Sequence, residues 1–408
     1  IGFNGGITYL MPIDTVEGIA PGALVYPAKT PVDYGKGYIT KSVIEPLPIG
    51  EELLGRVVDG LGRPIDGKGS GSSHLATQIQ RSINPLDRTP IHEPLDTGIR
   101  AINGLLTVGR GQRVGIFAGS GVGKSVLLGM LARNCVADVI VIGLVGERGR
   151  EVREFCEDTL GPESFGRAVV VAAPADASPL ARSKGASYAT DVATWFRDQG
   201  KHVVLIVDSL TRYAMALREI GLSLGEAPVA RGYPPSVFAR MPELVERVGN
   251  GINPNGSITA FYTVLLEGDD SNDPVADTAR GILDGHFFLA RELADSGHYP
   301  AIDIEKSISR VMPKVASREH LLSARRVKQL YSRYMRGRDL VSMGAYVAGS
   351  DPELDAALQS WPKIKEFLQQ DSEFSVGLEN TLQELFSIAP SEINPATPSP
   401  ALQNIRRV

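Results

Sequence analysis

Residues 118 to 125 constrain the fold of this chain more than any other segment. They read Ala-Gly-Ser-Gly-Val-Gly-Lys-Ser, after a strand-like apolar run (113–118) and before a stretch suited to a helix (126–132). In this context a glycine-rich loop wraps a polyphosphate, which meets backbone N–H groups and the positive end of the helix. The alternative is a glycine-rich turn that merely precedes a helix. The strand before the loop and the helix after it favour a phosphate-binding loop.

This loop supplies particular groups to a bound nucleotide. We expect Lys124 to reach the β- and γ-phosphates and the hydroxyl of Ser125 to bind Mg²⁺. Ala118 stands where the strict motif has glycine, and it is small enough for that turn. The predicted nucleotide-binding residues are Gly119, Ser120, Gly121, Val122, Gly123, Lys124 and Ser125.

From about residue 96 to 315, apolar strands alternate with helical segments, which indicates an α/β domain with a parallel sheet and crossover helices. Several strands are near-continuous apolar runs, as expected of strands buried on both faces. They are predicted at 113–118, 138–145, 168–173, 202–208, 257–265 and 285–289. Helices are predicted at 124–134, 149–159, 184–199 and 275–282.

The flanking regions have different patterns. Residues 1–95 are rich in turns and short β-like runs, which predicts a small N-terminal β-barrel, truncated at its start, and a proline-rich linker. Residues 316–390 predict a helical domain, with helices at 321–334, 352–370 and 376–387. The last residues, 391–408, are rich in Pro, Ser, Asn and Thr, so we expect a disordered tail.

Composition excludes some classes of protein. A formal net charge of −5 gives no basic footprint for nucleic acid. Cys135 and Cys156 show no metal-binding spacing and form no disulfide framework, so a reducing cytoplasm is expected. The longest apolar stretch, 136–145, is too short to span a bilayer and contains Asp138. No signal peptide is visible.

Two acidic residues follow predicted strands. Asp208 ends the run 202–208, where an aspartate holds Mg²⁺ directly or through water; its alternative role is to cap the next helix. Glu147 follows the strand 138–145 and is placed to orient and deprotonate an attacking water. Arg148, next to it, can contact the γ-phosphate. The alternative for these last two charges is a solvated helix N-terminus.

Two further residues are ambiguous from local sequence. Tyr299 lies in Gly-His-Tyr-Pro-Ala, a rigid turn that can offer an aromatic face to a base or simply pack. Arg310 precedes the helical C-terminal region, and such an arginine is more often a surface or salt-bridge residue.

Taken in chain order, these motifs resemble the catalytic subunits of rotary ATPases. The resemblance rests on 118–125, Gly146–Glu151, Asp208–Arg212, Gly232–Ser236, Gly297–Ala301 and Ser307–Arg310, and on Gly55–Asp66 near the N-terminus. The segments 208–216 and 256–264 are most similar to the type III export branch, particularly its flagellar members. This resemblance implies a RecA-like P-loop central domain between the N-terminal β-barrel and the C-terminal helical domain.

The resemblance also implies roles. Glu147, Lys124, Arg148 and Arg310 would be catalytic, Ser125 and Asp208 would bind Mg²⁺, and Tyr299 would stack on adenine. Arg310 would act on a neighbouring subunit's ATP, which implies a homohexamer. The expected partners are stalk and regulatory proteins of an export apparatus, exported substrates and their chaperones, with the ring cytoplasmic and peripheral to the inner membrane. Charged residues of the C-terminal helices, namely Arg325, Arg326, Lys328 and Arg333, are predicted to face such a partner. The alternative is a solvated helical face that merely packs on the core.

Several alternatives stay open. A virulence-type secretion ATPase and a proton-translocating rotary subunit share most of these motifs. A non-catalytic ring subunit would lack a glutamate at position 147. A nucleic-acid translocase of the same architecture would show aromatic residues among basic stretches in its N-terminal domain, where this chain has only scattered Lys and Arg.

Overall fold

The computed structural model describes residues 1–4, 6–13, 20, 22–24, 47–69, 74–76, 83–252, 256–266 and 273–389. The chain forms two compact units. The first unit comprises residues 1–89, 137–265 and 270–282, and the second comprises 90–136, 266–269 and 283–408. Much of the predicted N-terminal barrel, including 25–46, and the whole predicted tail lie outside the described residues.

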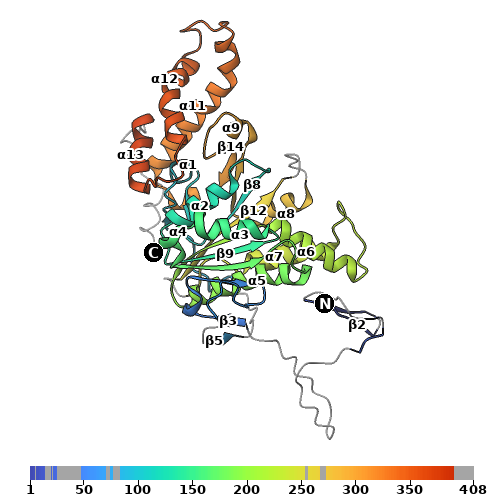
Figure 1. Ribbon diagram of the computed structural model, residues 1–408. Helices are drawn as coiled ribbons and strands as arrows, with labels where there is room; N and C mark the ends of the chain where they lie inside the picture. The colour runs from blue at the N-terminus through green and yellow to red at the C-terminus, as the bar shows by residue number, and fades with distance from the viewer. Residues whose placement is uncertain are drawn as a thin grey trace, which may run out of the picture. The chain divides into compact units, whose positions relative to one another are not determined.

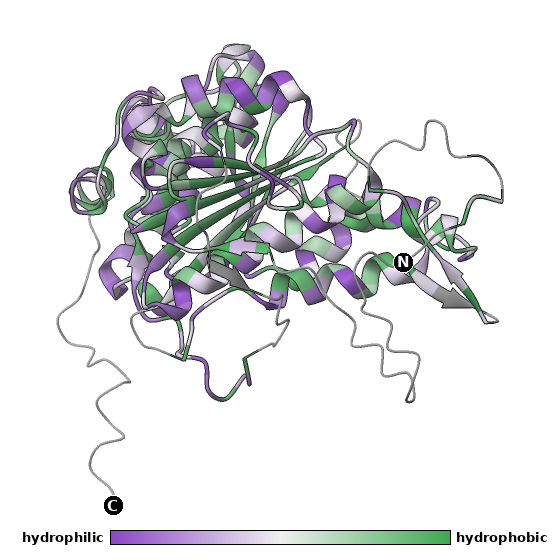
Figure 2. Cartoon of the chain, turned by 60° about the horizontal axis from the view of Figure 1, so that its bottom comes forward, coloured by the Kyte–Doolittle hydropathy of each residue, from purple (hydrophilic) through white to green (hydrophobic). Residues whose placement is uncertain are grey.

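The first unit is centred on parallel strands in the order β12-β11-β9-β10-β4. They are β4 (Arg56–Asp59), β9 (Val139–Val145), β10 (Ala168–Ala173), β11 (His202–Asp208) and β12 (Ser257–Leu265). Every residue of β9 and β10 is buried. In Figure 2 the strands are predominantly green, as expected of strands covered on both faces. Short antiparallel pairs join β1 (Gly2–Asn4) to β2 (Ile7–Tyr9) and β3 (Leu47–Ile49) to β5 (His74–Ala76).

Crossover helices connect these strands. After β9 come α3 (Gly149–Glu154), a π-helical turn (Phe155–Thr159) and α4 (Gly161–Phe165). After β10 comes α5 (Pro179–Asp198), which packs on β9, β10 and β11. The connection from β11 to β12 holds α6 (Leu210–Ser223) and α7 (Pro235–Glu246), and α8 (Pro274–Ile282) follows β12. A 3₁₀ turn, η1 (Glu51–Leu53), precedes β4.

The second unit has strands in the order β14-β13-β8, with β8 (Arg113–Ala118) parallel to β13 (Gly285–Leu289) and β14 (Ile302–Ser309) antiparallel to it. Helix α2 (Lys124–Asn134) follows β8. A short antiparallel pair, β6 (Pro94–Leu95) and β7 (Val108–Gly109), flanks α1 (Arg100–Leu105).

The rest of this unit is helical. After α9 (Arg291–Asp295) and α10 (Met312–Val315), the long helices α11 (Arg318–Ser342) and α12 (Pro352–Leu368) run side by side as a hairpin, and α13 (Leu378–Ile388) packs on both (Figure 1). The predicted helical C-terminal region is therefore confirmed.

The predicted strands match the structure closely, whereas the helices differ in extent. Helix α5 begins five residues before the predicted start at 184, because Ser178 caps it and Pro179 occupies its first turn. The helix predicted at 149–159 is interrupted by the π-helical turn. Helix α7 was not predicted, since it starts at the second of two consecutive prolines and contains Pro242, which argues against a helix interior. Strand β14 was also missed.

Candidate functional site

The phosphate loop connects β8 to α2 in the second unit. Strand β8 is buried up to Ala118, whose carbonyl accepts the Leu266 N–H at 3.0 Å. The loop then needs positive φ at Gly121 (76°) and Gly123 (89°), which glycine adopts readily. Helix α2 starts at Lys124 without a side-chain cap. The N–H groups of its first turn have no intrahelical acceptor, so this end of the helix suits an anion.

Tyr299 lies directly against this loop. A Cβ atom on Gly123 would come within 3.2 Å of the Tyr299 ring. The tyrosine is 44% exposed, and its carbonyl accepts the N–H of Gln370, which follows α12. Arg291 also contacts the loop, donating to the Ser120 carbonyl at 3.0 Å. The second unit thus brings the phosphate loop and the candidate adenine-binding ring together.

Arg310 lies away from the loop of its own chain. It follows β14, its N–H donates to the Asp284 carbonyl at 3.0 Å, and its guanidinium donates to Leu283 at 3.3 Å. Asp284 pairs with Arg113, the first residue of β8, at 2.9 Å. The loop follows the other end of β8, roughly 17 Å along a strand of this length. The described second unit therefore does not bring Arg310 to its own phosphate loop.

Asp208 ends β11, and Glu147 follows the neighbouring parallel strand β9, which ends at Val145. Asp208 is paired with Leu144 in the ladder, and the N–H of the next residue, Ser209, donates to the Val145 carbonyl at 3.3 Å. The carbonyl of Glu147 accepts the Ala175 N–H at 2.9 Å, which ties the residue to the segment after β10. Both acids thus lie at the carboxyl edge of the same parallel strands, where ligands of open α/β sheets bind.

Asp208 is buried, with 4% of its surface exposed. Its Oδ1 accepts a hydrogen bond from the Thr263 hydroxyl at 2.6 Å. Ser209 caps α6 by accepting the Arg212 N–H at 3.1 Å, so one residue holds the carboxylate and the next starts the helix. The alternative in which Asp208 itself caps this helix is wrong.

Thr263 was not singled out in the sequence, although a signal was present. It is a hydroxyl residue near the end of the otherwise largely apolar strand β12. A buried hydroxyl needs a partner, and the strand beside it ends in a carboxylate. Arg291 carried no comparable signal, because it is remote in sequence from the loop that it contacts.

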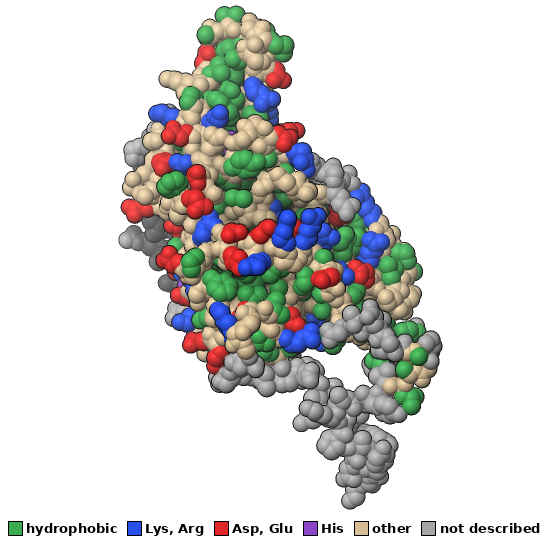
Figure 3. All heavy atoms as spheres, viewed as in Figure 1, with side chains coloured by type: hydrophobic (Ala, Val, Ile, Leu, Met, Phe, Trp, Pro, Cys, Tyr) green, Lys and Arg blue, Asp and Glu red, His purple; other side chains and the backbone are tan. Residues whose placement is uncertain are grey.

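Helix α3 begins directly after Glu147 and Arg148. Gly146, before them, has a φ of 73°, and a Cβ there would clash with Arg212 at 2.8 Å. Arg148 is exposed, and a series of ion pairs starts from it, joining Arg148 to Glu151 at 3.8 Å, Arg150 to Glu154 at 3.2 Å and Arg153 to Glu157 at 2.9 Å. Oppositely charged side chains are interspersed over the face shown in Figure 3.

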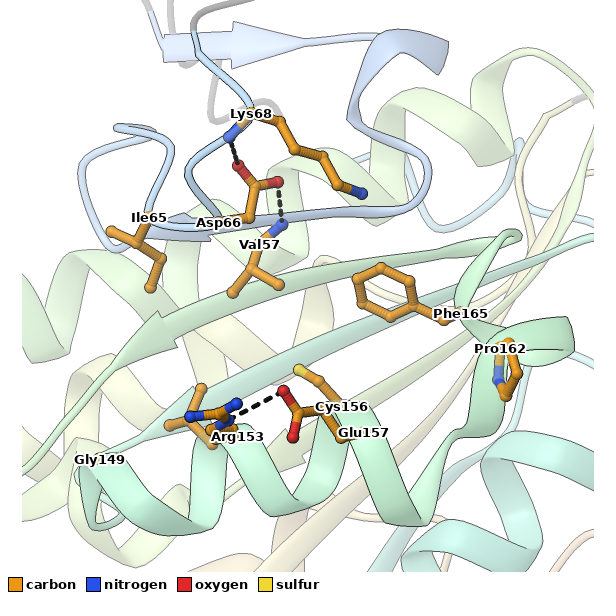
Figure 4. Close-up of a pocket in the computed structure, with 11 residues that line it drawn as sticks. Val57, Ile65, Asp66, Lys68, Gly149, Arg153, Cys156, Glu157, Pro162 and Phe165 are labelled. Carbon is orange, nitrogen blue, oxygen red and sulfur yellow. Dashed lines mark hydrogen bonds and ion pairs between the residues drawn. The ribbon is translucent and has the colours of Figure 1, made fainter.

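A cavity of about 740 Å³ lies between α3, the π-helical turn and the segment around β4 (Figure 4). Its acidic side chain Asp66 pairs with Arg56 at 2.7 Å and accepts the N–H groups of Val57 and Lys68, which hold the pKa of Asp66 well below its usual range. Burial, reinforced by Glu157, raises the pKa of Cys156 to about 11. This thiol is therefore protonated at neutral pH, and the cavity lacks the features of a reaction centre.

The oxygen donors predicted to bind Mg²⁺ fit that ion. Mg²⁺ is usually held by one or two carboxylates together with substrate phosphates and water, rather than by a cage of protein ligands. Asp208 offers a carboxylate and Ser125 a hydroxyl. In the part of the chain that the structure describes, no group of three or more His, Cys, Asp or Glu is placed to hold a metal. The same part contains no helix with the length and hydropathy needed to cross a bilayer.

Comparison with known proteins agrees with these features. The family model described as "ATP synthase alpha/beta family, nucleotide-binding domain" matches residues 98–309, and "T3SS EscN ATPase C-terminal domain" matches 316–387. The flagellum-specific ATP synthase of Salmonella typhimurium is 58% identical over 96% of this chain and 85% of its own length. The type 3 secretion system ATPase of Xanthomonas euvesicatoria is 50% identical over 84% of this chain and 77% of its own.

Solved structures agree as well. The assembled ATPase EscN from the type III secretion system of enteropathogenic E. coli matches with a TM-score of 0.81 and 47% identity, over 84% of this chain and 83% of that one. EscN in complex with its central stalk EscO matches with a TM-score of 0.78 and 46% identity, over 84% and 82%. The resemblance seen in the motifs is thereby confirmed, and this chain belongs to the ATP synthase alpha/beta family, within its branch of flagellar and type III secretion ATPases.

Proposed function

We propose that this protein is a Mg²⁺-dependent ATPase that drives flagellar protein export as a homohexameric ring. The main support is the pairing within the second unit of a phosphate loop with an aromatic ring 3.2 Å from a Gly123 Cβ position. The carboxyl-edge position of Glu147 and Asp208 adds the acids that hydrolysis requires. Higher identity to the flagellum-specific relative than to the type 3 secretion relative favours a flagellar role.

Each candidate residue then has a task. Lys124 and the first N–H groups of α2 bind the phosphates, and Tyr299 packs on the base. Glu147 accepts a proton from the attacking water while orienting it for in-line displacement at the γ-phosphate. Ser125 and Asp208 would hold Mg²⁺, which neutralises charge on the phosphate oxygens when bound. Arg148 adds a cation on the same side as Glu147.

In the ring, Arg310 adds a further positive charge to the nucleotide that a neighbouring subunit binds. Arg310 follows β14 and contacts Asp284, which pairs with the first residue of β8, so it lies at the opposite end of that strand from the phosphate loop. This position supports action between subunits. A ring also gives the stalk and the exported proteins a common face. On α11, Arg325 and Arg326 are exposed and available to such partners, whereas Lys328 is half-buried and Arg333 pairs with Asp351. Of the four residues predicted for this surface, only the first two fit.

Glu147→Gln tests the chemistry. Loss of the positioned base should lower the steady-state ATPase rate by about 10²–10⁴-fold, while the affinity for a fluorescent ATP analogue stays close to normal. Lys124→Ala should weaken both binding and turnover. Glu154→Gln, an exposed change on α3, is the matched control and should hydrolyse ATP normally. Near-normal hydrolysis by Glu147→Gln would show that this residue is not the base.

Export is tested in cells. Expression of this chain in a bacterium deleted for its flagellar export ATPase should restore motility, and the Glu147→Gln variant should not.

A double variant, Arg325→Glu with Arg326→Glu, should retain ATPase activity but lose stalk binding in a pull-down. Normal binding by this variant would place the stalk contact elsewhere. Restoration of virulence-type secretion but not of motility would favour the alternative export role.

A further inference from the structure

We infer that Thr263 is a positioning residue for the metal-binding carboxylate: its hydroxyl fixes the rotamer of Asp208 so that the aspartate binds Mg²⁺ with the nucleotide. This inference rests on the proposed function, because it takes Asp208 as the acid on the Mg²⁺ side. The observation behind it is the 2.6 Å hydrogen bond from Thr263 Oγ1 to Asp208 Oδ1.

The two residues come from adjacent strands. In the parallel ladder Val207 is paired with Tyr262, so the next pair along is Asp208 and Thr263. Side chains of such a pair lie on the same face of the sheet. Thr263 is fully buried and Asp208 nearly so. The hydroxyl therefore meets the carboxylate with little competition from water.

The hydrogen bond between Thr263 and Asp208 is favourable for both residues. A buried hydroxyl without an acceptor costs free energy, and a carboxylate is a strong acceptor. Distances of 2.5–2.7 Å are typical of charge-assisted O–H···O⁻ bonds, about twice as strong as neutral ones. Because the bond engages Oδ1, it sets the orientation of the whole carboxylate, including Oδ2.

The surrounding backbone keeps this geometry rigid. Thr211 on α6 accepts the Leu265 N–H at 2.9 Å, so the end of β12 is tied to the helix that Ser209 starts. The Thr263 hydroxyl thus reaches Asp208 from a strand end that is held in place by this hydrogen bond. Partners that orient a metal ligand in this way typically change metal affinity or activity about 10–100-fold when removed.

The test measures Mg²⁺ coupling directly, apart from turnover. The affinity of each variant for mant-ATP is measured with saturating MgCl₂ and again with EDTA. The Mg²⁺ ratio, which is the affinity with MgCl₂ divided by the affinity with EDTA, is then compared between variants. Thr263→Val, which keeps the shape but removes the hydroxyl, should reduce this ratio by about 10–100-fold. Thr263→Ser, which restores the hydroxyl, should recover most of it. Should the valine variant fail to fold, Thr263→Ala replaces it.

Thr259→Val is the matched control. Thr259 is a buried threonine on the same strand and face, about 13 Å from position 263. Thr259→Val should leave the Mg²⁺ ratio unchanged.

Asp208→Asn distinguishes a failure of this inference from a failure of the proposed function. If it removes Mg²⁺ coupling and Thr263→Val does not, Thr263 is a packing residue and the proposed function survives. If Asp208→Asn also keeps normal coupling, the assignment of the metal carboxylate fails, and with it this inference.

Discussion

Lys328, on α11, is a cation withdrawn largely from water. Burial lowers its pKa from 10.5 to about 8, and the Asp303 carboxylate on β14 opposes that shift only in part. Tyr331 shares this environment, where burial and the charges of Asp303 and Glu305 raise its pKa to about 12. A lysine in such a place weakens the folded state as long as it is charged.

This predicts a pH dependence with a definite sign. Between pH 8 and 10.5 the unfolded chain holds a proton on Lys328 that the folded chain has released, so stability should rise with pH across this window. Lys328→Met should remove that rise and raise the free energy of unfolding at pH 7 by about 1–3 kcal/mol. Urea unfolding at several pH values measures both effects. Lys363→Met, at an exposed position on α12, is the control. A pH profile of Lys328→Met parallel to the wild type would contradict the prediction.

At the scale of elements, an aromatic stack and a close approach at a glycine join α11 and α12 in their hairpin. The Trp361 ring lies 3.7 Å from that of Tyr334, inclined by 10°, and Tyr331 packs nearby at 5.7 Å. On the same two helices, a Cβ at Gly337 would come within 2.5 Å of Leu354. Close approach and aromatic contact together hold the two helices in register.

Trp361→Ala should therefore loosen this hairpin. Loss of a packed indole typically costs about 3–5 kcal/mol, and because this one is only half-buried we expect a smaller cost, about 2–3 kcal/mol. Hydrogen exchange should accelerate in α11 and α12 but not in β9 or β11. Trp361→Phe should show a smaller effect because it keeps a ring against Tyr334. Unchanged exchange in α11 would mean that other contacts hold the helices.

The elements differ in how well sequence predicts them. Strands such as β11 were predictable because a strand buried on both faces is a continuous apolar run. The phosphate loop and the acids at the strand ends were predictable from motif and position. Helix α7 was not predictable because its prolines argue against a helix. The contact of Thr263 with Asp208 was not predictable because only strand pairing brings the two residues together. Long-range contacts of this kind leave no local pattern.

At the scale of the whole molecule, the role proposed for Arg310 requires a second copy of the chain. Its guanidinium lies against Leu283, at the end of β8 opposite the phosphate loop. If Arg310 is catalytic as proposed, it therefore acts on the nucleotide of a neighbouring subunit. Specific activity should accordingly rise with protein concentration as rings form.

Mixing two inactive variants tests this arrangement. Arg310→Ala should bind ATP but hydrolyse it about 10³–10⁵-fold more slowly, as when other arginine fingers are lost. Mixed with Glu147→Gln, it should regain part of the activity, since some interfaces in a mixed ring carry both intact residues. Co-assembly is checked by light scattering. Mixed rings that stay inactive would show that Arg310 does not act across the interface.

The ion pairs along α3 determine how easily Arg148 can change partner. Its side chain is 78% exposed and its Nε lies 3.8 Å from the Glu151 carboxylate, and pairs of this kind contribute at most about 1 kcal/mol. If Arg148 binds the γ-phosphate as proposed, it can therefore leave Glu151 at little cost in free energy. Arg247, buried against Asp191, would lose far more by leaving. In the proposed function, Arg148 is thus a cation whose contact in this structure is weak enough to be given up for the nucleotide in each catalytic cycle.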